Sequence, residues 1–129
     1  MSKIIGKVSI IVMAILYFLA GLNHFRDPQF YLDIMPSFFP IKEILNFVSG
    51  GMEVVLAIGL ISVSTRKISA YLIILLLISF FVVHIAHLFQ TPDIYNELGK
   101  AAPYLRIVFQ FVFIYWAYKV GQNKQRILN

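Results

Sequence analysis

The sequence predicts an all-α, membrane-embedded four-helix bundle with an interfacial segment after the first helix. Hydrophobic residues make up 60% of the 129 residues and charged residues only 13%. The mean hydropathy of +0.81 lies well above the balance of a soluble domain. Four apolar segments are each about as long as the ~20 residues that a helix needs to cross a bilayer. Together they leave only short connections, so residues 1–129 form one transmembrane domain.

The first predicted span covers residues 4–22 and ends in a polar cluster that contains His24. Residues 28–40 follow; they are rich in aromatic residues and interrupted by prolines. This stretch is too short and too interrupted to span a membrane. We therefore expect it to lie at the level of the lipid headgroups and to cap the bundle.

The second predicted span covers residues 44–64 and carries Glu53 near its middle. A carboxyl group at that depth costs several kcal/mol unless it is protonated, paired or facing a wet cavity. Glu53 is therefore the first marker of a functional site. The basic pair Arg66 and Lys67 ends this segment.

The last two predicted spans cover residues 68–89 and 103–120, and each holds two polar side chains on one helical face. These pairs are His84 with His87 and Arg106 with Gln110. Pro103 suits the first turn of the fourth helix, where its missing N–H is not needed.

Basic residues predict the orientation, because Lys and Arg are retained on the cytoplasmic side of a membrane. On one side of the predicted bundle lie Lys3, Lys7, Arg66, Lys67, Lys119, Lys124 and Arg126, without acidic residues in those flanks. Both termini are therefore predicted to be cytoplasmic. The formal net charge of +5 reflects this topology, so we do not expect nucleic-acid binding.

The same topology brings polar side chains from separate helices into the outer half of the membrane. Glu53 should lie about 13 Å below the outer boundary at the rise of an α-helix. We predict one polar pocket that opens outward and has its floor near Glu53. Its predicted lining is His24, Glu53, His84, His87, Arg106 and Gln110.

Structural roles remain open for several of these residues. Arg106, near a helix end, can extend to the headgroups. His24 and His87 can be solvated helix termini. Glu53 can serve only to pair with Arg106 or a histidine and so hold the bundle together.

Three runs of the sequence carry a series of short motifs: AGLNHFRDPQFYLDIMPSFFP, SGGMEVVLAIGL and LRIVFQFVFIYWAY. Their order resembles the DoxX-like family of small bacterial integral membrane proteins. The matching positions are His24, Pro28, Tyr31, Met35, Pro36, Ser49, Gly50, Glu53, Arg106 and Gln110. The resemblance adds Tyr31 to the pocket and implies the bacterial cytoplasmic (inner) membrane. It also implies a link to quinones, because the family name comes from a subunit associated with thiosulfate:quinone oxidoreduction.

The leading hypothesis is a pocket that binds an amphipathic small molecule, a quinone or an isoprenoid-type lipid, in a subunit of a quinone-linked redox complex. The chain has no cysteine, which excludes thiol relays and thiolate metal sites. It also shows no haem or iron–sulfur signature, so no intrinsic cofactor is expected and a redox partner subunit would supply such centres.

Two alternatives stay open. In the first, the protein is a membrane-embedded, isomerase-like acid/base enzyme, with Glu53 and a histidine, best His84, as the candidate catalytic residues. In the second, His24, His84, His87 and Glu53 hold a metal, although Arg106 would repel a cation, and we expect none. Gly50 and Gly51 suit packing within the bundle and between protomers equally, so the oligomeric state is also open.

Overall fold

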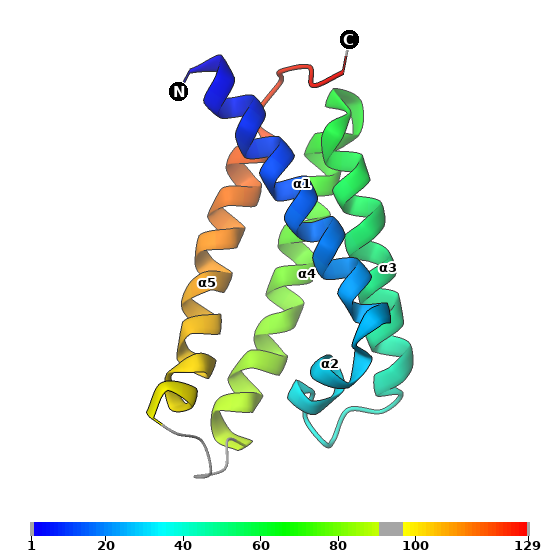
Figure 1. Ribbon diagram of the computed structural model, residues 1–129, viewed down its shortest axis with the longest axis vertical. Coiled ribbons are helices and arrows are strands. Elements are labelled where there is room, and N and C mark those ends of the chain that lie inside the picture. The colour runs from blue at the N-terminus through cyan, green and yellow to red at the C-terminus, as the bar shows by residue number, and fades with distance from the viewer. Residues whose placement is uncertain (1, 91–96, 129) are drawn as a thin grey trace.

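A computed structural model describes residues 2–90 and 97–128, and within these ranges the protein is helical, without strands. The five helices described there are α1 (Lys3–Arg26), α2 (Pro28–Ile34), α3 (Lys42–Ile61), α4 (Val63–Gln90) and α5 (Glu97–Gly121). The four long helices run side by side and the short α2 lies at one end (Figure 1). The prediction of an all-α fold is confirmed.

Three of the described helices, α1, α3 and α4, are long and apolar enough to cross a membrane. This finding supports the prediction of a multi-pass membrane protein. α5 is not among the three; it carries Arg106, Gln110 and Lys119 within its length.

The long helices associate in two pairs. α1 packs chiefly against α3, α4 packs chiefly against α5, and α3 and α4 join the pairs. Both termini lie at the same end as the α3–α4 junction, and α2 lies at the opposite end (Figure 1). We call these the terminal end and the α2 end.

Helix α1 continues to Arg26, four residues beyond the predicted span, so His24 lies inside its last turn. Asp27 then ends α1 and begins α2. Its backbone N–H donates to the carbonyl of Asn23, and its carboxylate accepts from the N–H of Phe30. Pro28 follows in the first position of α2, where its fixed φ favours helix initiation. The predicted interfacial segment is thus partly helical.

The predicted boundaries between the second and third spans were wrong. α3 ends at Ile61 and α4 begins at Val63, so that Ser62 alone separates them. Ser62 is extended, with φ −82° and ψ 134°, and its carbonyl accepts from the N–H of Arg66. This tight junction places Arg66 in the first turns of α4 instead of in a loop.

The predicted start of the fourth helix was also wrong. α5 begins at Glu97, so Pro103 lies inside the helix and not in its first turn. Proline contributes no N–H at this position, yet the helix continues through it to Gly121.

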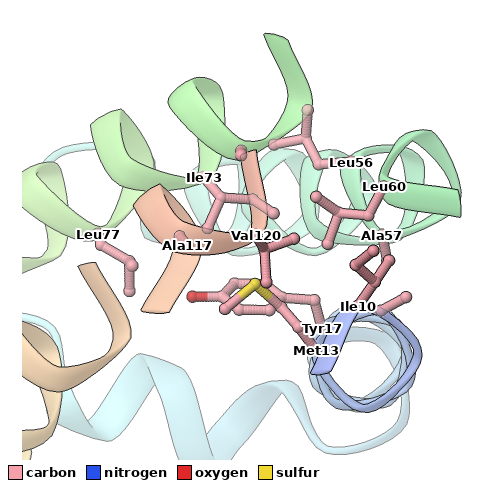
Figure 2. Close-up of a cluster of buried hydrophobic side chains, with 12 residues drawn as sticks. Ile10, Met13, Tyr17, Leu56, Ala57, Leu60, Ile73, Leu77, Ala117 and Val120 are labelled. Carbon is pink, nitrogen blue, oxygen red and sulfur yellow. The ribbon is translucent and has the colours of Figure 1, made fainter. Parts of the chain in front are cut away.

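An apolar core fills the half of the bundle toward the terminal end, with side chains from all four long helices (Figure 2). Its buried members are Ile10, Met13, Ala14, Tyr17, Leu56, Ala57, Leu60, Ala70, Ile73, Leu77, Ala117 and Val120. Trp116 packs against this core, and its indole N–H donates to the hydroxyl of Ser9 at 2.8 Å, which links α5 to α1.

Arg66 is buried at the terminal end, with 1% of its surface exposed. Its Nε and Nη2 donate to the carbonyls of Leu60 and Ile61, at 2.7 and 2.9 Å. Its Nη1 donates to the carbonyls of Asn123 and Gln125, at 2.8 and 2.7 Å. The guanidinium therefore caps the C-terminal end of α3, where a positive charge also complements the helix dipole. Its other two bonds hold the segment that follows α5 against this end. The sequence had suggested only a flanking cytoplasmic charge.

Glycines bring α1 and α3 into backbone contact near the α2 end. A Cβ atom on Gly50 would lie 2.5 Å from the Cβ of His24 and 2.9 Å from the carbonyl oxygen of Gly21. A Cβ atom on Gly21 would lie 2.7 Å from the carbonyl oxygen of Gly50. A Cβ on Gly51, in contrast, would meet nothing within 4 Å. Gly50 therefore serves packing within the bundle, and it holds α3 close enough for its side chains to reach His24.

Candidate functional site

The close contact between α1 and α3 creates one wall of the candidate site. Asn46, Gly50 and Glu53 follow at i, i+4 and i+7, so all three lie on the buried face of α3. His24 of α1 faces this stripe and is buried. The wall is thus formed by a histidine, an amide and a carboxyl group around one glycine.

Asn46 fixes the orientation of His24 through two hydrogen bonds. Its side-chain N–H donates to the backbone carbonyl of His24 at 2.9 Å. The amide oxygen of Asn46 therefore points to Nδ1 of His24, 2.7 Å away. A carbonyl oxygen only accepts, so Nδ1 carries a proton and Nε2 is directed to the other side of the ring.

On that other side lies Glu53. Its Oε2 is 3.5 Å from Nε2 of His24, which is ion-pair distance. Glu53 is only 5% exposed, and its Oε2 has no hydrogen-bond partner among the described residues. A carboxyl group in these surroundings needs a further hydrogen-bonding group.

Tyr31 of α2 covers His24 at the α2 end. The two rings are stacked, with centroids 3.6 Å apart and an angle of 16° between their planes. The Tyr31 hydroxyl accepts from Asn23 at 3.2 Å and donates to the carbonyl of Ala20 at 3.4 Å. Burial raises the pKa of Tyr31 above its ordinary value, so the phenol is neutral and acts as a donor at neutral pH.

The opposite wall comes from α4 and α5. Arg106 of α5 donates from Nη1 to Nδ1 of His87 at 3.1 Å. His84 lies one turn before His87 on α4, and its Nδ1 is buried without a hydrogen-bond partner among the described residues. This wall therefore presents a guanidinium and an unsatisfied imidazole nitrogen.

A cavity of about 210 Å³ lies between the two walls. Its surface is mainly apolar, with a few polar groups. It is lined by Ala20, His24, Phe30, Tyr31, Ile34, Met35, Ser49, Glu53, Phe80, Val83, His84 and Arg106. All five helices contribute at least one of these residues.

Of the residues predicted to line a pocket, His24, Tyr31, Glu53, His84 and Arg106 border this cavity. His87 does not line the cavity, but its Nδ1 accepts from Arg106, which does. Gln110 does not reach it, because its side-chain N–H donates to the carbonyl of Leu77 at 3.2 Å. Gln110 borders instead a neighbouring groove of about 370 Å³, which is lined by His84, Arg106, Phe109, Gln110 and Phe113.

Asn46 is the site residue that the sequence analysis missed. It is 0% exposed and lies two turns before Glu53 on the same face of α3. The i, i+7 spacing of Asn46 and Glu53 was the one feature of the sequence that could have indicated this residue. A polar residue near the start of a predicted span is ordinary, however, unless its partner across the bundle is known.

The described part of the chain holds no group of three or more His, Asp or Glu side chains that could bind a metal ion. His24 and Glu53 lie together on one wall, whereas His84 and His87 lie on the other with Arg106. The four candidate ligands are thus divided between the two walls of the cavity.

Residues 13–121 match a family described as a domain of unknown function (DUF8561). No curated protein and no solved structure matches the chain.

Proposed function

The chain belongs to the DUF8561 family, and from the geometry of its cavity we propose that it is a multi-pass membrane protein that binds an amphipathic small molecule. The proposed ligand is a quinone or an isoprenoid-type lipid with a compact polar head. Its head would occupy the cavity between the two helix pairs, and its tail would remain among apolar side chains.

One observation carries this proposal: two polar atoms on opposite walls are buried without partners among the described residues. Glu53 Oε2 lies on the α1–α3 wall and His84 Nδ1 on the α4–α5 wall. Buried polar groups in native proteins are almost always satisfied, so such orphans need an explanation. A ligand whose head forms hydrogen bonds on two sides would satisfy both.

The dimensions favour a ring-sized head. A cavity of about 210 Å³ is smaller than the roughly 300–1,000 Å³ of sites that enclose a whole drug-sized ligand. The neighbouring groove shares His84 and Arg106 with it and continues along Phe109 and Phe113 of α5. An apolar tail could follow this groove to the surface of the bundle.

We further propose that α5 is a fourth span and that both termini are cytoplasmic. The basic residues at the terminal end then lie on the side that retains Lys and Arg, and the cavity near the α2 end opens outward. Together with the resemblance to DoxX-like proteins, this orientation supports a bacterial inner membrane as the proposed location. There it would supply a lipid-binding site to a redox partner subunit.

We expect the Glu53→Ala variant to lose the bound molecule. Purified wild-type protein should carry a quinone or isoprenoid lipid that mass spectrometry detects, and the variant should carry at least about tenfold less, as expected when a buried hydrogen-bonding group is removed. Gly51→Ala is the matched control, because Gly51 lies in open space two residues away. Equal amounts of the same molecule in wild type and Glu53→Ala would contradict the proposal.

The pairing of His24 with Glu53 favours a second candidate, an acid/base enzyme acting on such a lipid. Here Glu53 would abstract a proton from carbon and a histidine would assist at the carbonyl. Protein incubated with its lipid in deuterated water should then place deuterium on the ligand. Glu53→Gln should slow this exchange by about 100-fold or more while ligand binding stays measurable. Exchange at the wild-type rate in this variant would exclude the mechanism.

A further inference from the structure

The two hydrogen bonds of Asn46 determine which protons the His24–Glu53 pair can carry. Because Nδ1 of His24 is committed to the amide oxygen of Asn46, only Nε2 can gain or lose a proton at the cavity. Nε2 faces Oε2 of Glu53. The pair therefore holds one transferable proton, which lies either on the carboxyl group or on the imidazole.

Both arrangements have zero net charge, which is what a buried site in hydrocarbon requires. Without a ligand the proton should be on Glu53, because its Oε2 lacks, among the described residues, the hydrogen bonds that would stabilise a carboxylate. Other ionisable groups face the pair from the surrounding helices. These are Tyr17 on α1, Tyr31 on α2, His84 on α4 and Arg106 on α5.

We propose that Asn46 is a positioning residue that lets the pair bind both the oxidised and the reduced form of one quinone-class ligand. The proposal rests on the proposed function of the cavity. With a carbonyl ligand, the protonated carboxyl group of Glu53 donates. With a hydroxyl ligand, the proton moves from Glu53 to Nε2 of His24 and the carboxylate accepts from the ligand. No electron is transferred and no charge enters or leaves the site.

Two substitutions of Asn46 have opposite expected effects. The carboxylate introduced by Asn46→Asp would accept from Nδ1 and favour the imidazolium, so that Glu53 is left as an acceptor. This variant should therefore bind the oxidised form about tenfold more weakly than the wild type, and it should bind the reduced form with unchanged affinity. Leucine offers Nδ1 no acceptor, so His24 would carry its proton on Nε2, and this nitrogen could then take no proton from Glu53. Asn46→Leu should bind the reduced form about tenfold more weakly than the wild type, and it should bind the oxidised form with unchanged affinity.

The two variants control for each other, because both lose the bond from Asn46 to the carbonyl of His24. The measurement is equilibrium binding of a short-tailed benzoquinone and its hydroquinone to purified protein. The proposal is supported if the ratio of the affinities for quinone and hydroquinone changes in opposite directions in the two variants. A ratio that is the same in the wild type and both variants, or that shifts in the same direction in both, overturns it.

A measurement without ligand separates this proposal from the proposed function. The infrared band of a protonated carboxyl group, identified as that of Glu53 by its loss in Glu53→Gln, should be present in wild type and Asn46→Leu and absent in Asn46→Asp. If neither form of the quinone binds wild type, the proposed function fails whatever this band shows. If the band persists in Asn46→Asp, Asn46 does not control the proton and the present proposal fails.

Discussion

Replacing Arg66 by methionine should lower the free energy of unfolding by at least about 3 kcal/mol, because hydrogen bonds to a charged group contribute roughly 1.5–3 kcal/mol each and several are lost together. The methionine side chain is about as long as the aliphatic part of the arginine side chain, so it keeps the apolar contacts of that part. The change would leave the carbonyls of Leu60, Ile61, Asn123 and Gln125 without their donor. The segment after α5 should then become accessible to protease.

Lys67→Met is the matched control, since it removes a neighbouring positive charge from an exposed side chain. It should change stability by less than about 0.5 kcal/mol. Arg66→Lys should be intermediate, because an ammonium lacks the planar fork that reaches four carbonyls. Unfolding by denaturing detergent and limited proteolysis would measure these effects. Equal stability of Arg66→Met and Lys67→Met would show that the guanidinium does not hold the terminal end together.

Gly50→Ala should both destabilise the protein and disrupt the site. The added methyl group would lie 2.5 Å from the Cβ of His24 and 2.9 Å from the backbone of Gly21, so α1 and α3 must move apart. Overpacking of this kind typically costs about 1–3 kcal/mol. The same movement would separate Nε2 of His24 from Glu53, so ligand binding should fall together with stability.

Gly51→Ala provides the comparison on the next residue of the helix. Its methyl group enters open space, and alanine is favoured over glycine inside a helix by about 0.5–1 kcal/mol. This variant should be as stable as wild type or slightly more stable, with unchanged ligand binding. If both alanine variants behave alike in detergent unfolding and ligand binding, the close approach of α1 and α3 is not what holds the wall.

Hydropathy and the placement of charge were sufficient to predict a helical membrane protein and to place His24, Glu53 and His84 in the same half of it. These features depend on local sequence and on the alternation of helix direction. The ends of helices were less predictable. The junction at Ser62 and the start of α5 before Pro103 depend on backbone geometry that the apolar pattern does not report.

The residues that sequence reasoning misjudged all depend on distant partners. Arg66 follows an apolar run, as stop signals do, but it bonds to carbonyls 57 and 59 residues away. Asn46 bonds to His24, 22 residues away, and neither side chain alone indicates the pair. Gln110 shares a helical face with Arg106, yet the carbonyl of Leu77 takes its side chain away from the cavity.

The interleaving of Asn46, Gly50 and Glu53 on one stripe of α3 has an evolutionary consequence. Helix packing and the proposed ligand site depend on the same stripe of α3, which leaves this stripe little freedom for change. His84 and Arg106 face the cavity from α4 and α5, apart from the glycine contact. A descendant or a redesigned protein that selects another head group would therefore diverge first on the α4–α5 wall.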